Sequence, residues 1–142
     1  MVLYSDEVEF RGNPMVRSLH RNTIEVTKDP HLTPKGDCII GVNADKGLSE
    51  LSSSVKEAIV TENSKLILTI EVPPHSFVVR ATGGTNLTLE SHEEMVIRRS
   101  SFVSPRTLAL NADAAAKDLP RHMVEALRDP RSRGVLRIEA RS

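Results

Sequence analysis

Polar and apolar residues alternate most regularly between residues 65 and 72, where every even-numbered side chain is apolar. A period of two is typical of a β-strand with one buried face. The pair Pro73-Pro74 ends this strand, because proline has no N–H to donate to a sheet. Other strands are expected at residues 8–11, 22–27, 37–42, 76–82, 86–90 and 136–140, with a glycine turn at 83–84. The strands between residues 65 and 90 are expected to form an antiparallel meander.

Two stretches carry apolar residues at the spacing of an α-helix. The first runs from about Leu48 to Val60, and the second begins with Asp113 as its expected N-cap and continues to Leu127. Pro120 lies inside the second stretch without changing the phase of the apolar stripe, so one kinked helix is expected there. Each helix has a single apolar stripe, which predicts that both pack on the outside of a sheet.

The order of the expected elements predicts a mainly β fold of the α+β class. Strands and helices do not alternate along the chain as they do in a doubly wound parallel sheet. We therefore expect an antiparallel β-sandwich, or a jelly-roll-like half-open barrel, with the two helices packed on the outside. No internal repeat and no long linker is evident, and 142 residues are the size of a single domain spanning residues 1–142.

Composition restricts both the core and the location of the protein. The chain has three Phe, one Tyr and no Trp, so its core is expected to be aliphatic. Cys38 is the only cysteine, which excludes a disulfide within the chain. The first residues lack the pattern of a signal peptide, and no stretch approaches the roughly 20 apolar residues of a membrane span. These features predict a cytoplasmic protein with no membrane partner.

Charge is unevenly distributed, although the whole chain is neutral. Residues 1–97 hold 9 basic and 14 acidic side chains, whereas residues 98–142 hold 10 basic and 5 acidic ones. Most of the cations are arginines, which can bind phosphate or carboxylate through two N–H groups at once. This asymmetry indicates either an anion-binding face in the last third of the chain or two parts that neutralise each other in the fold.

No standard catalytic or cofactor motif is present. The glycine-rich phosphate loops of nucleotide-binding proteins are missing, so the sequence identifies no cofactor. None of the five histidines has the spacing of a metal-ligand pair, and no metal site is expected. Cys38 lies in a run typical of a strand interior, where a buried and unreactive side chain is expected in place of a nucleophile.

Polar side chains near the ends of the expected strands are the best candidates for a binding site. Glu25 and Thr27 continue the polar side of the strand at 22–27. If this strand pairs with the one at 37–42, carboxylate, histidine and hydroxyl groups converge at one rim, where they could bind a polar ligand or transfer protons. The alternative is the ordinary polarity of turns and sheet edges. The ligand-binding candidates are His20, Thr23, Asp37 and Asp45, with Arg98, Arg99 and Arg106 to hold an acidic group.

Several of these segments resemble the signature of an archaeal family, domain of unknown function 371. The similar residues are 20–29 and 32–42, followed by 99–102, 106–108 and 111–119. The resemblance extends over roughly residues 10–127. It implies an archaeal, cytoplasmic protein with a β-sandwich of jelly-roll type. It implies no activity, because the family has none assigned.

The sequence leaves three functions open and does not decide whether the protein is an enzyme. The first is a domain that binds a small anionic ligand, with or without catalysis. The second is a nucleic-acid-associated protein that uses the arginine-rich last third, although few aromatic side chains are available to stack on bases. The third is an interaction module that forms homo-oligomers through a sheet face.

Overall fold

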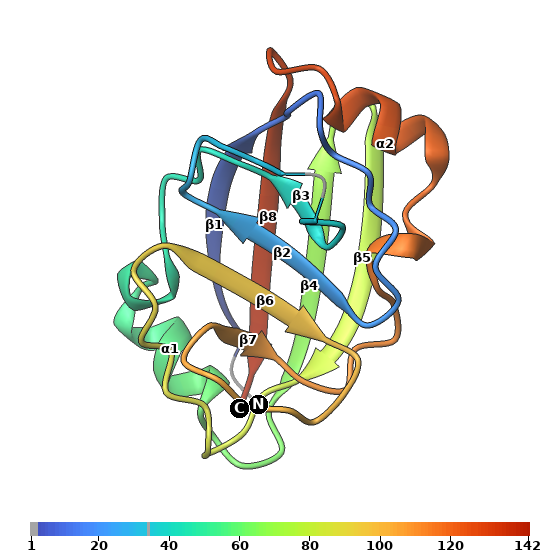
Figure 1. The fold of residues 1–142 in the computed structure, drawn as a ribbon. Helices are drawn as coiled ribbons and strands as arrows, with labels where there is room; N and C mark the ends of the chain where they lie inside the picture. The colour runs from blue at the N-terminus through green and yellow to red at the C-terminus, as the bar shows by residue number, and fades with distance from the viewer. Residues whose placement is uncertain (1–2, 34) are drawn as a thin grey trace.

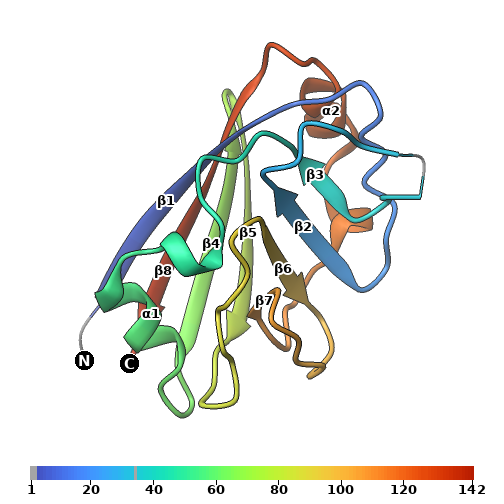
Figure 2. The same ribbon diagram turned by 60° about the vertical axis from the view of Figure 1, so that its left-hand side comes forward.

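Two four-stranded β-sheets face each other in the computed structural model, which describes residues 3–33 and 35–142 (Figures 1 and 2). The first sheet has the strand order β1-β8-β4-β5, and the second has the order β3-β2-β6-β7. The strands are β1 (Leu3–Arg11), β2 (Thr23–Thr27), β3 (Ile39–Gly41), β4 (Lys65–Val72), β5 (His75–Thr82), β6 (Glu94–Arg98), β7 (Thr107–Ala109) and β8 (Arg133–Arg141). The helical elements are η1 (Leu48–Glu50), α1 (Ser53–Ile59), η2 (Ala116–Asp118) and α2 (Arg121–Leu127), where η marks a 3-10 helix. The expected mainly β fold with two α-helices is confirmed.

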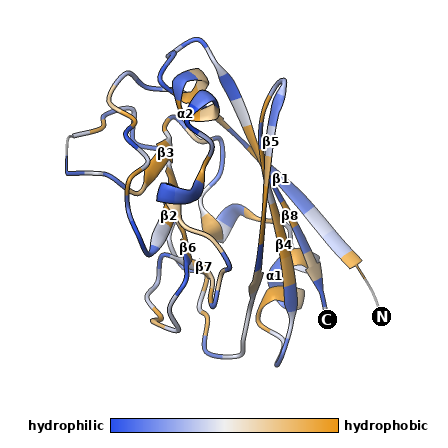
Figure 3. Cartoon of the chain, turned by 90° about the vertical axis from the view of Figure 1, so that its right-hand side faces the viewer, coloured by the Kyte–Doolittle hydropathy of each residue, from blue (hydrophilic) through white to orange (hydrophobic). Residues whose placement is uncertain are grey.

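Strand β4 lies between β8 and β5 in the first sheet and matches the strand expected at residues 65–72. Its side chains alternate along its whole length, and Leu68 and Ile70 are fully buried in the core. Figure 3 shows the two sheets edge-on, with apolar residues on strands of both. Most of the largest fully buried side chains are Ile and Leu, and Phe10 is the only aromatic one among them. The burial of these aliphatic side chains between the sheets is the main stabilising contribution to the fold.

The two α-helices lie at opposite corners of the paired sheets (Figure 1). Each buries one side, as a single apolar stripe predicts. The buried side chains are Val55, Ala58 and Ile59 in α1, and Met123, Val124 and Leu127 in α2. Neither these helices nor any other in the described part of the chain has the length and apolarity needed to cross a membrane.

Both helices are shorter than the sequence pattern predicts, because a separate 3-10 turn precedes each of them. The expected kinked helix across Pro120 is wrong. Leu119 and Pro120 have extended ψ angles of 135° and 137°, and Pro120 is the N-cap of α2. Proline disfavours the helical conformation in the residue before it, which explains the break. Asp113 is not a helix N-cap either, since it lies before η2 and its carboxylate accepts the backbone N–H of Arg80.

The strand assignments need two corrections. Residues 86–90 form no strand, so a loop follows the β4–β5 hairpin in place of a third meander strand. Strands β6 and β7 were not expected, because the central residues of β6 are all buried and β7 has only three residues, which leaves no alternation to detect. The pairs β2–β3 and β6–β7 are parallel, whereas the other neighbouring strands in both sheets are antiparallel.

The chain consists of two halves with the same order of elements, which contradicts the expectation that it has no internal repeat. Residues 3–72 contain β1, β2, β3, η1, α1 and β4, and residues 75–141 contain β5, β6, β7, η2, α2 and β8. The sequence Asn-Ala-Asp follows β3 at residues 43–45 and β7 at residues 111–113. Asn43 and Asn111 have positive φ angles of 52° and 53°, so the two halves also share a turn conformation.

Equivalent contacts recur in the two halves and join them. Gly12 follows β1 and lies against the end of α2, whereas Gly83 follows β5 and lies against the end of α1. A Cβ atom at Gly12 would lie 2.5 Å from the carbonyl oxygen of Leu127, and one at Gly83 would lie 2.1 Å from that of Ile59. Only glycine fits at such distances. Each half thus packs against the helix of the other.

Strands from the two halves alternate in the first sheet. In the order β1-β8-β4-β5, every neighbouring pair contains one strand from residues 3–72 and one from residues 75–141. In the second sheet the only ladder between the halves is that of β2 with β6, among the strands described. Neither half can therefore form the first sheet alone.

Phe10 marks a packing difference between the halves. Its ring covers Gly134, its cross-strand partner, and Gly41, so that a Cβ atom at either glycine would lie within 2.2 Å of a ring carbon. The equivalent cross-strand pair in the first sheet is Ala81 with Leu66. In one pair the large side chain is Phe10 on the edge strand β1, opposite Gly134 on the central strand β8. In the other pair the large side chain is Leu66 on the central strand β4, opposite Ala81 on the edge strand β5. The space between the sheets is filled in both cases.

This exchange of the large and the small side chain predicts strong energetic coupling between Phe10 and Gly134. Phe10→Ala alone should lower the free energy of unfolding by about 3–5 kcal/mol, because it leaves a cavity. Gly134→Leu alone should destabilise by about 3 kcal/mol or more, because its Cβ overlaps the ring. The double variant reproduces the Ala81–Leu66 pair and should be more stable than either single variant in urea denaturation. Additive losses would contradict this account of the core.

Candidate functional site

The outer face of the β3-β2-β6-β7 sheet carries a buried carboxyl group near its centre. Ile24 and Val26 of β2 belong to the core, so Glu25 between them points to the other side of the sheet. Its exposed fraction is nevertheless only 6%. The segments that follow β2 and β6 turn back over this face, and Cys38 and Arg106 from those segments contact the Glu25 side chain.

The contacts of the Glu25 carboxylate are all long. Its Oε1 atom lies 3.9 Å from Sγ of Cys38 and 3.7 Å from Nη1 of Arg106. The same Arg106 nitrogen donates a shorter hydrogen bond of 3.1 Å to Oε2 of Glu94, on the neighbouring strand β6. Arg106 therefore links a buried carboxyl group to a partly exposed one while remaining about half exposed itself.

Arg98 brings a second guanidinium group to the same face. Its Nε donates a 2.8 Å hydrogen bond to Oγ1 of Thr107, and its Nη2 donates a 3.1 Å hydrogen bond to Oγ of Ser104. The guanidinium carbon also lies 4.9 Å from the centre of the Phe102 ring, a cation–π distance. These contacts hold the side chain in one orientation. We call Glu25, Glu94, Arg98 and Arg106 the central cluster.

Burial shifts the pKa values of the groups on this face. Burial, together with the negative charge of Glu94, raises the pKa of Glu25 to about 7, against the opposing effect of Arg106 and Arg98. Burial and the charge of Glu25 raise the pKa of the Cys38 thiol, which disfavours the thiolate that a nucleophile requires. Burial and the nearby charge of Arg106 lower the pKa of Arg98. Glu25 is thus the cluster member whose pKa is raised toward neutral pH.

An open hollow of about 390 Å³ adjoins the central cluster. Arg106 and Glu94 form one side of it. The other lining residues are Glu90, Ser91, His92, Glu93 and Pro105. His92 is held by Ser49, whose Oγ lies 2.6 Å from the imidazole Nδ1. A small molecule bound to Arg106 therefore has room for its remaining atoms beside Pro105 and His92.

His20 takes part in the turn that leads into β2. Its Nδ1 lies 3.1 Å and 3.2 Å from the backbone nitrogens of Asn22 and Thr23, and 3.0 Å from Oγ1 of Thr23. The ring nitrogen therefore accepts hydrogen bonds from the turn. In the other half, Oγ of Ser91 accepts from two backbone N–H groups at the start of β6 in the same way. This equivalence indicates a structural role for the Nδ1 atom of His20.

The structure brings four of the seven predicted candidates to this face of the second sheet. Thr23, Arg98 and Arg106 lie along β2, β6 and the approach to β7, and His20 adjoins Thr23. Asp37 lies close by through its backbone, because its carbonyl oxygen accepts the N–H of His20, but its carboxylate faces Arg17 at 3.5 Å.

Arg99 and Asp45 lie outside the central cluster. Arg99 follows β6 and has an exposed side chain, and its backbone N–H donates to Asn22. Asp45 lies beside β1 of the first sheet. Sequence reasoning placed Glu25 on the polar side of its strand but left it out of the candidate ligands. Its position between Ile24 and Val26 in a short strand was the available indication of burial.

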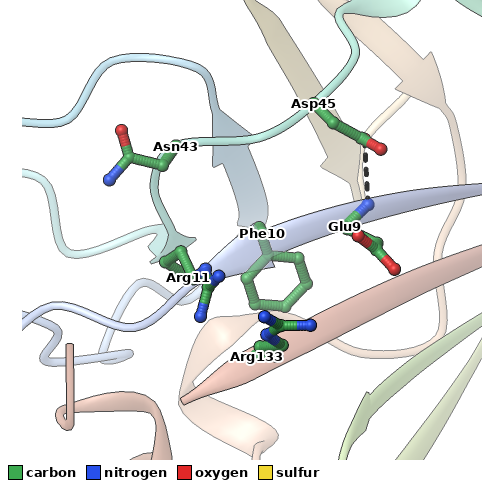
Figure 4. Close-up of a pocket in the computed structure, with 6 residues that line it drawn as sticks. All are labelled: Glu9, Phe10, Arg11, Asn43, Asp45 and Arg133. Atoms are coloured by element: carbon green, nitrogen blue, oxygen red, sulfur yellow. Dashed lines mark hydrogen bonds between the residues drawn. The ribbon is translucent and has the colours of Figure 1, made fainter. Parts of the chain in front are cut away.

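The carboxylate of Asp45 stabilises the edge of the first sheet (Figure 4). Its Oδ1 accepts the backbone N–H of Glu9 in β1 at 2.9 Å, and its own N–H donates to the Glu9 carbonyl. Asp113 makes the same two contacts with Arg80 in β5, the first at 3.0 Å. Because both halves use the aspartate in this way, the hydrogen bonds of Asp45 are explained by the fold.

Residues 3–33 and 35–142 contain no group of three His, Cys, Asp or Glu side chains arranged to hold a metal ion. The central cluster offers a ligand two guanidinium groups and two carboxyl groups. Guanidinium groups do not bind cations, and they favour an anionic ligand.

Matched substitutions test the structural role of Asp45. Asp45→Ala and Asp113→Ala each remove an acceptor from an edge strand, so each should lower the free energy of unfolding by about 1 kcal/mol, with additive effects. Asp37→Ala removes only an exposed ion pair and should cost less than about 0.5 kcal/mol. Thermal unfolding of these three variants and of the Asp45→Ala/Asp113→Ala double variant measures these values. A large cost for Asp45→Ala with none for Asp113→Ala would contradict the equivalence of the halves.

The raised pKa of Glu25 predicts a pH-dependent stability difference. Its pKa rises from 4.5 to about 7 on folding, so the folded protein binds this proton more tightly than the unfolded chain does. Stability from this group is full at low pH and falls as the pH rises from about 4.5 to about 7, by about 3 kcal/mol in total. Glu25→Gln cannot ionise and should gain stability relative to the parent protein across this window. Urea denaturation at several pH values measures the difference, and a constant difference would rule out the shifted pKa.

Comparison with known proteins supports the resemblance in the sequence. The family model described as "Domain of unknown function (DUF371)" matches residues 8–141. The chain is also 38% identical over 122 residues to the uncharacterized protein MJ0206 of Methanocaldococcus jannaschii, a match that covers 86% of this chain and 90% of that protein. The predicted family is therefore confirmed, and the chain belongs to the family of domain of unknown function DUF371.

Proposed function

We propose that the protein binds a small carboxylate-bearing ligand at the central cluster and that protonation of Glu25 controls this binding. The observation that carries the proposal is the buried Glu25 carboxyl group beside Arg106, with a pKa raised to about 7 by burial. A neutral Glu25 can donate an O–H to an incoming carboxylate, whereas an ionised Glu25 repels it.

The charge of the cluster depends on this one proton. With Glu25 protonated, Arg98 and Arg106 outweigh Glu94, and the cluster carries one net positive charge. With Glu25 ionised, the charges cancel. In a partly buried site such a change of one charge alters the attraction for an anion substantially, because charges there are screened less than in water. The ligand and the Glu25 proton are thus expected to bind together.

The two guanidinium groups have donors to spare. Arg98 uses Nε and Nη2 in the hydrogen bonds to Thr107 and Ser104, and Arg106 uses Nη1 for Glu94 and Glu25. Within the described residues, Nη1 of Arg98 and Nε and Nη2 of Arg106 have no protein acceptor. Adjacent N–H groups of one guanidinium can bind both oxygens of a carboxylate. Arg106, which is about half exposed, is the group an incoming ligand meets first.

Catalysis at this site is a second candidate. A carboxyl group with a pKa near 7 is suited to proton transfer at neutral pH, and Glu25 has this property. Cys38 adds no nucleophile, because its thiol pKa is raised. The proposal keeps the cytoplasmic location predicted from the sequence.

Nucleic-acid binding by the last third of the chain receives less support. Its arginines are distributed over both sheets, with Arg98 in β6 and Arg137 in β8. Arg137 is paired with Glu7 and Glu71, and Arg121 donates to several backbone carbonyl groups. Arg121 and Arg137 are thus engaged in contacts within the fold, which leaves them less available to bind a phosphate backbone.

Titration with acetate and lactate, followed by NMR shifts of backbone amides, tests the proposal. Both ligands stay ionised above about pH 6, so a pH effect reports on the protein. Affinity should fall about tenfold between about pH 6 and about pH 8, because Glu25 loses its proton. Arg106→Gln should weaken binding about tenfold or more at the lower pH.

Two variants serve as controls for this titration. Glu25→Gln keeps a neutral polar group and should bind with an affinity that does not depend on pH. Arg99→Gln removes an exposed cation beside Arg98 in the chain but outside the central cluster, and should leave the affinity unchanged. Affinity that is independent of pH in the parent protein, or equal losses in Arg99→Gln and Arg106→Gln, would refute the proposal.

A further inference from the structure

Three cations surround a hollow of about 230 Å³ on the outer face of the first sheet. Lys65 at the start of β4 lies directly opposite Arg141 of β8. Arg80 of β5 lies opposite Ile67, which is two residues from Lys65 and on the same face of β4. Leu66, Ile67 and Ala81 also line it, but the side chains of Leu66 and Ala81 are buried in the core, so Ile67 supplies the apolar side chain of the hollow.

None of the three cations is in an ion pair among the described residues, although the Asp113 carboxylate accepts the backbone N–H of Arg80 and Glu139 lies opposite Ile67. Nine ion pairs are present in that part of the chain, and none includes Lys65, Arg80 or Arg141. Like charges directly opposite each other on neighbouring strands are destabilising. An anion bound between them would remove this repulsion.

The equivalent corner of the other half has a different composition. There Arg133, the first residue of β8, occupies the place that Lys65 has in β4, and Glu9 occupies the place of Arg80. The corner also contains Arg11 and Asp45, the equivalent of Asp113, so Glu9 in place of Arg80 is the carboxylate that distinguishes it (Figure 4). The fold therefore does not require a group of three cations at this position.

We propose that the hollow at Lys65, Arg80 and Arg141 binds a phosphate monoester carried on a short apolar body. A phosphate monoester carries a charge between about −1.5 and −2 at neutral pH, which suits three cations better than a single carboxylate does. Ile67 supplies the contact for the apolar part. The site is on the opposite sheet from the central cluster and does not depend on it.

The charge pattern of the rest of this face favours a small ligand over a nucleic acid. Glu7, Glu71 and Glu139 lie on the same outer face, and two of them are paired with Arg137 at its centre. A phosphate backbone laid along the sheet would meet these carboxylates between the basic corners. One phosphate group at the corner avoids Glu7 and Glu71 and has Glu139, opposite Ile67, as its carboxylate neighbour on this face.

Titration with n-butyl phosphate, followed by amide NMR shifts, tests the proposal. The shifts should be confined to the first residues of β4 and the last residues of β5 and β8. Lys65→Gln and Arg80→Gln should each weaken binding about fivefold or more, since each removes a charge-assisted hydrogen bond. Both variants should fold, because they relieve repulsion, and their melting temperatures at low salt should equal or exceed that of the parent protein.

Arg133→Gln and Arg11→Gln are the matched controls, since they remove cations from the equivalent corner, and neither should change the affinity. Inorganic phosphate should bind more weakly than butyl phosphate, and n-butanol should not bind. Absence of binding at about 10 mM butyl phosphate, or equal losses in the two corners, would overturn the proposal. Binding of a single-stranded oligonucleotide that Arg11→Gln and Arg80→Gln weaken equally would also overturn it, in favour of a polyanion surface.

Discussion

The alternation of strands from the two halves in the first sheet is the constraint on which the rest of the structure depends. The central strands β4 and β8 have hydrogen-bonding partners from the opposite half only. Their apolar faces form one side of the core, so the core cannot close before both halves are in place. Gly12 and Gly83 add to this by placing each half against the helix of the other. Cooperative unfolding of the whole chain follows from such an arrangement.

The same arrangement places the central cluster where the halves meet. Glu25 is the middle residue of β2, Val96 is the middle residue of β6, and the two are directly opposite each other. Some equivalent positions of the two halves carry the same residue, as Asp45 and Asp113 do. A contact that both halves need for folding explains why the residue is the same. Where equivalent positions differ, as Cys38 before β3 and Arg106 before β7 do, the fold requires neither residue. Comparison of the halves thus separates structural polar residues from candidates for chemistry.

Sequence patterns predicted the elements whose burial follows a simple period. Strand β4 was found in full because its two faces differ in burial, whereas β6 was missed because its central residues are buried on both faces. The repeat was missed because the halves preserve contacts and turn conformations more than residue identities, as the exchange of Phe10–Gly134 for Leu66–Ala81 shows. The candidate site was found in part, through the polarity of Thr23 and the neighbouring strands. The burial of Glu25 depends on the segments that carry Cys38 and Arg106, which fold back over the sheet. A pattern of neighbouring residues in the sequence cannot predict such contacts.

Direct titration of the Glu25 side chain tests the central claim most directly. The carboxyl carbon of Glu25, assigned by comparison with the Glu25→Gln variant, can be followed by carbon-13 NMR as the pH is raised. Burial beside Glu94 predicts a midpoint near 7, well above the 4.5 of an unperturbed glutamate. A midpoint near 4.5 would show that the carboxyl group is ionised at neutral pH. In that case the central cluster would carry no net positive charge there, and the proton-controlled binding of an anion would be wrong.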